Sequence, residues 1–364
     1  MKKIAILINC FLLLCVMFIG CGGKTDGSAN KKMPETVDCT DVSDAEDVSP
    51  DFTLNLSDVL KDKGKECAFS EFVFEDKFYY VLEYAHDGAQ YSYKYEIYED
   101  DNGKETLLYS SDSIVWLNEF TIHMGKLFWV EFTNEEDGFD YQLIQYDLDS
   151  GLKECIAEYS SADLAEILLT SGDGYLAWYE NSGDNTKLKY YDIKNKTVNT
   201  YDKQDIAVLS SYDRPEIVKE TVTFFIKEKG KIDCVNYNLK TRKEKKTALP
   251  ENYNFVGYAA NSKGVAWFTN FVSGKFFFYN IKSNKLSNIV FPDEINIFSL
   301  NSDAEYVYFN MRGDKNYLFS LDNDKKSKAY EYTDQFVGTH FGRNKYGSYI
   351  RLEKDGKVGV KLFY

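Results

Sequence analysis

The chain has 364 residues, with 43 lysines and arginines against 58 aspartates and glutamates, so its formal net charge is −15. Such an acidic balance argues against binding to nucleic acid, and against direct docking on anionic lipid or a phosphate-rich polymer, because those partners attract basic surfaces. Tyrosine and phenylalanine are abundant, at 29 and 26 residues, whereas proline is scarce, at 5. This composition suits β-sheets, since proline lacks the N–H group that ladder hydrogen bonds need.

The first twenty residues have the pattern of a signal peptide. A basic start, Met1-Lys2-Lys3, precedes an apolar run over residues 4–19 that is too short for a membrane-spanning helix. The run ends at Gly20-Cys21, which resembles the bacterial lipobox, in which a small residue precedes a cysteine that becomes diacylated. We therefore expect cleavage after residue 20 and anchoring by the lipid on Cys21 at the extracytoplasmic face of the cell membrane. An ordinary cleaved signal with an incidental cysteine is the alternative.

Residues 21–50 are dominated by small and polar residues, and their second half is acidic. They offer too little apolar surface to offset the entropy that ordering would cost. We therefore expect a flexible acidic tether that holds a globular part, residues 51–364, away from the bilayer.

A repeat built only from strands fills that globular part. Its first marker is an aromatic or apolar residue in a strand core, at Tyr80, Trp129, Trp178, Phe225, Trp267, Tyr308 and Ile350. Its second marker is a tyrosine or phenylalanine, usually followed by Asp or Asn, an apolar residue and a polar turn, at Tyr98, Tyr146, Tyr191, Tyr237, Tyr279 and Phe319. Both markers recur every 40 to 49 residues. A strand-only repeat of that length is typical of a β-propeller, with one copy per blade.

Each copy resolves into four short strands, as in residues 254–291, where turn residues separate strands at 254–258, 265–268, 275–281 and 286–291. The seventh copy supplies only three strands, near 336–340, 348–352 and 358–363. The segment 51–56 alternates apolar with polar residues and could supply the fourth, although an ordered linker is the alternative. We therefore expect an all-β, seven-bladed β-propeller of four-stranded antiparallel blades, closed by an N-terminal strand.

No residue pattern predicts a cofactor or a metal site. The three histidines, His86, His123 and His340, lie far apart, and no motif for a hydrolase nucleophile, a zinc protease or a nucleotide loop is present. Asp147-Leu148-Asp149-Ser150-Gly151 resembles a calcium loop, but its glycine comes one place early, so we expect a plain turn.

Seven cysteines include Cys10 and Cys15 in the signal and Cys21 at its end. The other four lack metal-ligand spacing, and we expect buried free thiols, with Cys39–Cys67 as a possible disulfide bond.

The repeated unit Gly-x-Leu/Val-x-Trp followed by Tyr-Asp-Leu/Ile resembles the blades of bacterial propellers of the TolB-like kind. It is also similar to those of the low-density-lipoprotein-receptor-like (YWTD-related) kind, and both likenesses cover residues 52–364. This resemblance implies binding of an extracytoplasmic protein or ligand at one mouth of the ring, and it brings no catalytic residues. The alternative is a propeller enzyme of the glycosidase, lyase or lactonase type, which carboxylates meeting on the ring axis would favour.

The loops that join the second and third strands vary most between copies, and divergent loops on a rigid scaffold are where binding usually resides. Our candidate binding residues are Phe132, Phe139, Phe271 and His86. We expect the three phenylalanines to be exposed near Glu135, Glu136 and Asp137, where they suit a peptide or a sugar of cationic character. Solvated hairpin tips without a partner are the alternative.

Overall fold

Strands account for nearly all of the described structure, a computed structural model. It describes residues 35–38, 46–48, 51–55, 59, 67–85, 93–111, 116–135, 138–161, 167–182, 185–203, 206–207, 214–228, 231–249, 257–261, 263–269, 276–290, 297–302, 306–311, 315–320, 328–332, 337–344, 347–354 and 357–363. The expected signal peptide, Cys21, Cys39, His86 and Phe271 lie outside these residues. Within the described ranges, no helix has the length and hydropathy to span a membrane.

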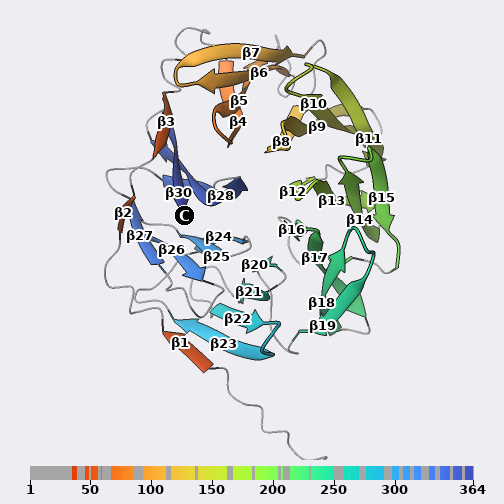
Figure 1. Cartoon of the computed structure of the whole chain (residues 1–364), viewed down its shortest axis with the longest axis vertical. Coiled ribbons are helices and arrows are strands. Elements are labelled where there is room, and N and C mark those ends of the chain that lie inside the picture. Colours follow the sequence, from red (N-terminus) through yellow and green to blue (C-terminus); the bar gives the residue numbers. More distant parts are fainter. Residues whose placement is uncertain are drawn as a thin grey trace, which may run out of the picture. The chain divides into compact units, whose positions relative to one another are not determined.

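The described strands form seven sheets, and in the first four the strand order follows the chain (Figure 1). The first sheet contains β4 (Cys67–Phe74), β5 (Phe78–Ala85), β6 (Tyr93–Asp101) and β7 (Lys104–Ser110). The second contains β8 (Trp116–His123), β9 (Lys126–Glu135), β10 (Gly138–Asp147) and β11 (Lys153–Ser161). The third contains β12 (Thr170–Gly172), β13 (Tyr175–Ser182), β14 (Asn185–Asp192) and β15 (Thr197–Tyr201). The fourth contains β16 (Glu216–Val218), β17 (Thr221–Glu228), β18 (Lys231–Asn238) and β19 (Glu244–Ala248).

Each of the last three sheets takes one strand from the N-terminal part of the chain. The fifth sheet contains β20 (Gly257–Ala260), β21 (Gly264–Phe268), β22 (Phe276–Asn280) and β23 (Lys285–Val290), with β1 (Glu35–Asp38) beside β23. The sixth contains β24 (Ile297–Ser302), β25 (Tyr306–Met311), β26 (Lys315–Ser320) and β27 (Lys328–Tyr332), with β2 (Glu46–Val48) beside β27. The seventh contains β28 (Val337–Asn344), β29 (Gly347–Lys354) and β30 (Lys357–Phe363), with β3 (Phe52–Asn55) beside β30.

The strands expected from the repeat are present in order. The segment 254–291 forms β20 to β23, close to the boundaries that the turn residues indicated. The first marker column lies on the second strand of each sheet, and its members Tyr80, Trp129, Trp178, Phe225 and Trp267 are all buried. An antiparallel pair formed by β3 and β30 joins residues about 300 positions apart, including Leu54 with Val358.

The stretch assigned to a tether is partly structured. β1 pairs in parallel with β23, and β2 pairs in parallel with β27. The sequences of these strands, Glu-Thr-Val-Asp and Glu-Asp-Val, carry almost no apolar surface, so the backbone ladder of an existing sheet edge orders them. The compact unit accordingly begins at Glu35 rather than near residue 51.

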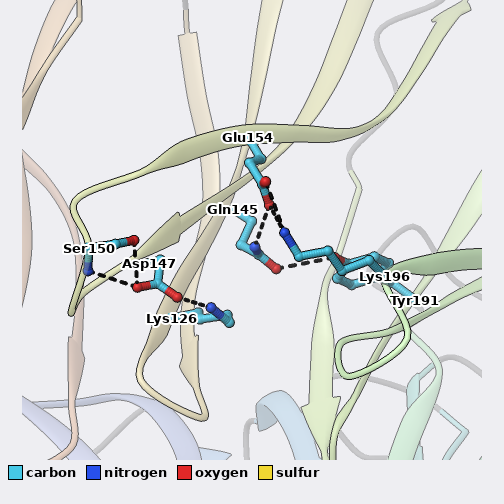
Figure 2. A network of polar contacts seen from close by, with 7 residues as sticks. All are labelled: Lys126, Gln145, Asp147, Ser150, Glu154, Tyr191 and Lys196. Atoms are coloured by element: carbon cyan, nitrogen blue, oxygen red, sulfur yellow. Dashed lines mark hydrogen bonds and ion pairs between the residues drawn. The ribbon is translucent and has the colours of Figure 1, made fainter.

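The recurring Asp or Asn after the second marker forms the turn between the third and fourth strands. The Asp147 carboxylate accepts hydrogen bonds from Ser150 N at 2.9 Å and Ser150 Oγ at 2.8 Å, and it also binds Lys126 (Figure 2). Asp192, Asn238 and Asn280 accept the same backbone bond three residues on, at 2.7 to 3.0 Å. An Asx turn explains why Asp and Asn exchange freely here, and it occupies the oxygens that a calcium loop would need.

The apolar residue that follows fixes this turn to the rest of its sheet. Its backbone N–H donates to a carbonyl in the first–second turn, as Ile193 N does to Gly174 O at 3.0 Å and Leu239 N to Glu220 O at 2.8 Å. Ile193 and Leu239 are both buried. Each sheet therefore has a turn end, which carries the first–second and third–fourth turns, and the second–third hairpin lies at its other end.

Adjacent sheets are joined by hydrophobic clusters. Such clusters join the first sheet to the second, the second to the third, the third to the fourth and the fourth to the fifth. Another cluster joins Leu54, Val358 and Val360 of the seventh sheet to Phe74 and Tyr80 of the first. The fifth and sixth sheets touch through β20 and β24, and the sixth and seventh through β25 and β28. Stability therefore depends on contacts between neighbouring sheets as well as on each ladder.

His123, at the end of β8, also links the second sheet to the third. Its Nε2 accepts a hydrogen bond from Gly174 N at 2.9 Å, which requires the neutral ring. Burial lowers the pKa of His123 from its ordinary 6.5, although Asp173 opposes the shift. The unfolded chain therefore binds the proton more tightly, so the stabilisation is full above about pH 6.5 and is lost as the pH falls.

We expect the free energy of unfolding to fall between pH 7.5 and pH 5.5 by more in the wild-type protein than in His123→Asn. The asparagine side chain cannot titrate in that range, so it removes this proton-linked component. Urea unfolding at a series of pH values measures the difference. Parallel pH profiles for the two proteins would show that His123 makes no such contribution.

Candidate binding surface on the first two sheets

Charge is distributed very unevenly along the chain. Residues 67–161, which form the first two sheets, contain 21 Asp and Glu and only 5 Lys, a formal net charge of −16. Residues 185–249, in the third and fourth sheets, contain 15 Lys and Arg and 9 Asp and Glu, a net charge of +6. The potential around the first two sheets therefore attracts cations much more strongly than the total charge indicates.

The hairpin between β9 and β10 carries an aromatic group. Phe132 and Tyr141 are cross-strand partners whose rings stack with centroids 5.5 Å apart, and Phe139 lies 6.3 Å from Phe132 and 6.4 Å from Tyr141. Tyr141 also stacks on its β11 partner Tyr159, at 4.8 Å and an interplanar angle of 5°. Such cross-strand aromatic contacts stiffen the hairpin and place the aromatic rings on one face of it.

Carboxylates flank this aromatic group. Asp140 is exposed between Phe139 and Tyr141, and its carboxylate accepts a hydrogen bond from Ser160 Oγ. Glu135 ends β9 opposite Gly138, and Glu136 and Asp137, which lie outside the described residues, complete the sequence of the tip. Aromatic faces and carboxylates together bind ammonium and guanidinium groups, through cation–π contacts and charge-assisted hydrogen bonds.

The structure corrects one expectation about this hairpin. Phe132 is only 8% exposed and belongs to the cluster between the second and third sheets, so it is not the exposed candidate that the sequence indicated. Phe139 is partly buried against the same cluster and keeps some accessible surface. Truncating Phe132 would cost about 3–5 kcal/mol of stability as a buried phenylalanine, which disqualifies it as a probe of binding.

Tyr159 has an unusual hydroxyl in this group. The oxygen is buried, and among the described residues it has no hydrogen-bond partner. Burial, with a smaller contribution from Tyr141, raises the pKa of Tyr159, so the phenol stays neutral and can both donate and accept. It supplies a polar atom beside the aromatic group.

A buried polar cluster between the first and second sheets was missed by the sequence analysis. The Glu131 carboxylate, 6% exposed, accepts hydrogen bonds from Trp129 Nε1 at 3.0 Å, from Lys153 Nζ at 2.8 Å and from the Tyr95 hydroxyl. Burial opposes the charge of Lys153, but its hydrogen bonds to Glu131 and Tyr109 outweigh burial and raise its pKa. Because several donors already converge on the Glu131 carboxylate, we assign the cluster to sheet packing. In the sequence, the one feature that indicates this cluster is Glu131, an acidic residue within the apolar run of β9.

Glu71 and Glu119 occupy equivalent places on first strands. Each precedes the phenylalanine that pairs with a first-marker residue, Phe72 with Tyr80 and Phe120 with Trp129, and the ladder shifts register there in both sheets. Glu119 has a φ of 50°, which an L-residue adopts at a cost. The strands that carry them, β4 and β8, touch each other.

One of the two free cysteines among the described residues is exposed, although the sequence predicted buried thiols. Cys155 and Cys234 are both free, as expected, and Cys234 is buried, but Cys155 is exposed on β11. The described residues contain no group of three or more His, Cys, Asp and Glu side chains that could hold a metal ion.

Solved structures with a similar fold are β-propellers. The β-propeller domain of the Trilobed protease from Pyrococcus furiosus, described as having an open velcro topology, aligns over 80% of this chain and 91% of its own length, with a TM-score of 0.55 and 11% identity. The acylaminoacyl peptidase of Pyrococcus horikoshii aligns over 79% of this chain, with a TM-score of 0.54 and 11% identity. The aligned part is 49% of that peptidase, so this chain spans about half of its length.

TolB from Acinetobacter baumannii aligns over 83% of this chain and 88% of its own, at 12% identity, but its TM-score of 0.38 carries no argument. No protein-family model and no curated protein sequence matches the chain. Identities of 11% support the fold alone. The chain is an all-β protein with a β-propeller fold.

Proposed function

We propose that the chain is a lipid-anchored extracytoplasmic β-propeller that binds a protein, peptide or glycan bearing cationic groups, and that it performs no catalytic step. The Gly20-Cys21 junction behind a short apolar run supports the anchor. The seven sheets, five of four strands and two of five, the β3–β30 pair and the cluster between the seventh and first sheets support a seven-bladed ring closed by β3.

One observation carries the binding role: Phe139, which keeps accessible surface beside the buried rings of Phe132 and Tyr141, lies on a carboxylate-flanked hairpin within residues 67–161, whose net charge is −16. The hairpin is rigid because its rings stack across three strands. A pre-organised aromatic and acidic surface loses little entropy when a cationic group docks on it.

A propeller enzyme is the second candidate, and the pair Glu71 and Glu119 is the observation that favours it. Both strands carry a glutamate at the same place, and glycoside hydrolysis uses two carboxyl groups, one as an acid and one as a nucleophile or base. The enzyme ranks second because the positive φ of Glu119 is typical of functional sites in general and does not point to any one reaction. Conversion of a bound glycan to a shorter product would move the assignment to this candidate.

We expect the full chain to bind a hexalysine peptide, with an affinity that falls as salt rises, and to leave a hexaglutamate peptide unbound. Glu136→Gln/Asp137→Asn should weaken hexalysine binding about tenfold, which corresponds to about 1.4 kcal/mol. Phe139→Ala should weaken it by a smaller factor, through loss of a cation–π contact. Isothermal titration calorimetry measures each affinity.

The matched control is Asp149→Asn/Asp202→Asn, which removes the same charge from exposed positions away from the hairpin. If this control weakens hexalysine binding as much as the hairpin pair does, the attraction comes from total charge and not from a site. Equal affinity for hexalysine and hexaglutamate would refute the proposed ligand class.

A further inference from the structure

The turn end of the third, fourth and fifth sheets is cationic, in contrast to the total charge of the chain. Exposed Lys and Arg residues lie in or directly beside its turns, among them Lys194, Lys196, Lys219, Lys240, Arg242, Lys243 and Lys282. The acids nearby are partly engaged, because Asp192 accepts hydrogen bonds within its own turn and Glu220 pairs with Lys240 at 2.9 Å. This region therefore presents an excess of positive charge.

The chain places three of its cations, Lys196, Lys219 and Arg242, where the backbone disfavours them, and two of these occupy the same turn position. The fifth residue of the third–fourth turn has a φ of 51° to 69° in four sheets, where it is Gly151, Lys196, Arg242 and Asn284. Gly and Asn adopt this conformation most readily, whereas other L-residues lose about 1 kcal/mol or more. Lys196 pairs with Glu154 of the second sheet at 2.9 Å, which accounts for its charge (Figure 2). Arg242 donates to the neutral Asn199, so within the described residues its charge is not used by an ion pair and points to another role.

The cationic turns form a continuous surface across neighbouring sheets. Arg242 Nη2 of the fourth sheet donates to Asn199 Oδ1 of the third at 3.3 Å, and Lys203 of the third binds Glu244 of the fourth at 3.0 Å. Glu244 is the only acid among residues 240–246, and it also accepts from Tyr201 at 3.0 Å. Lys243 and Lys245 have no ion-pair partner among the described residues, so their charge faces solvent.

The N-terminal part of the chain enters at this same end. β1 runs parallel to β23 with Glu35 opposite Ser287, and β23 begins directly after the third–fourth turn of the fifth sheet. β1 therefore begins at the turn end. Only 13 residues, 22–34, separate Cys21 from β1, and a random chain of that length spans about 20 Å. That span exceeds the Debye length of about 8 Å at physiological ionic strength, so the attraction acts only when the surface comes close to the bilayer.

We propose that the turn end of the third to fifth sheets docks on the anionic headgroups of the membrane that holds the lipid anchor. This rests on the proposed anchor at Cys21. Attraction of about 1 kcal/mol per basic residue near an anionic surface is weak alone, but the anchor raises the effective concentration of the surface at the bilayer. Docking then turns the second–third hairpins, including β9–β10, away from the bilayer and toward a soluble ligand.

The test uses the lipidated full chain in vesicles of phosphatidylcholine alone, or of equimolar phosphatidylcholine and phosphatidylglycerol. An amine-reactive reagent labels lysines, and mass spectrometry gives the rate at each one. We expect Lys240, Lys243 and Lys282 to be labelled about fivefold more slowly on the anionic vesicles, and high salt to abolish the difference. Lys187 and Lys227, exposed near the opposite end of their sheets, should be labelled at equal rates on both.

Lys240→Glu/Arg242→Glu/Lys243→Glu should remove the protection of Lys282, whereas Lys187→Glu/Lys227→Glu/Lys231→Glu, with the same change of charge, should keep it. Equal labelling of every lysine on both kinds of vesicle would overturn the docking proposal while the protein still floats with the vesicles. A protein that does not float at all would instead remove the proposed anchor. Protection of the same lysines by soluble polyglutamate, and not by anionic vesicles, would assign the surface to an acidic polypeptide.

Discussion

Replacing Leu54 by Ala is expected to lower the free energy of unfolding by about 2–5 kcal/mol, the usual cost of truncating a buried leucine. Leu54 is 5% exposed and belongs to the cluster of Phe74, Tyr80, Val358 and Val360. Deleting residues 51–55 is expected to cost more, because it also exposes the edge of β30. In the folded protein this edge pairs with β3. Asp51 adds two hydrogen bonds to it: Asp51 N donates to Val360 O at 2.8 Å, and Leu362 N donates to Asp51 Oδ2 at 2.9 Å.

Deleting residues 35–38, which form β1, is the matched control. β1 is also a four-residue edge strand, but it is polar and parallel, and parallel pairing is the weaker kind. Its loss should therefore change stability far less than the loss of β3. Chemical denaturation followed by the fluorescence of Trp129, Trp178 and Trp267 measures both, and similar small effects would contradict closure by β3.

The strands and turns were predictable because their signals are local. Asp147 and Asn238 recur at one place since an Asx turn needs only a side-chain oxygen three residues before a backbone N–H. Trp129 and Trp178 recur since the second strands of the first five sheets are buried on both faces.

β1 and β2 could not be predicted in the same way. Glu-Thr-Val-Asp and Glu-Asp-Val have no apolar alternation, and their order depends on the open edges of β23 and β27, about 250 and 285 residues away in sequence. A composition that indicates disorder in isolation is compatible with a strand when a sheet edge supplies the hydrogen-bond partners.

The sequence singled out the β9–β10 hairpin as a candidate site, and that assignment stays a prediction. The β9–β10 hairpin was identified by the aromatic and acidic residues around Glu135, yet the sequence could not show that Phe132 packs on Tyr141 while Phe139 stays accessible. The charge partition between residues 67–161 and 185–249 was available in the sequence. The total charge of the chain does not show this partition. Counting charged residues sheet by sheet predicts both the acidic first two sheets and the cationic turn end.

Anchoring at Cys21 is the claim on which the proposed orientation depends, since it decides which end of the propeller faces the bilayer. In cells that process lipoproteins, the wild-type chain should fractionate with membranes and incorporate a labelled fatty acid. Cys21→Ala should lose the label and either pass almost entirely into the soluble fraction or keep its signal peptide unprocessed, because no lipid is attached. Cys155→Ala, which changes an exposed thiol in the folded part, should behave as the wild type does. A processed Cys21→Ala protein that still fractionates with membranes would contradict the account.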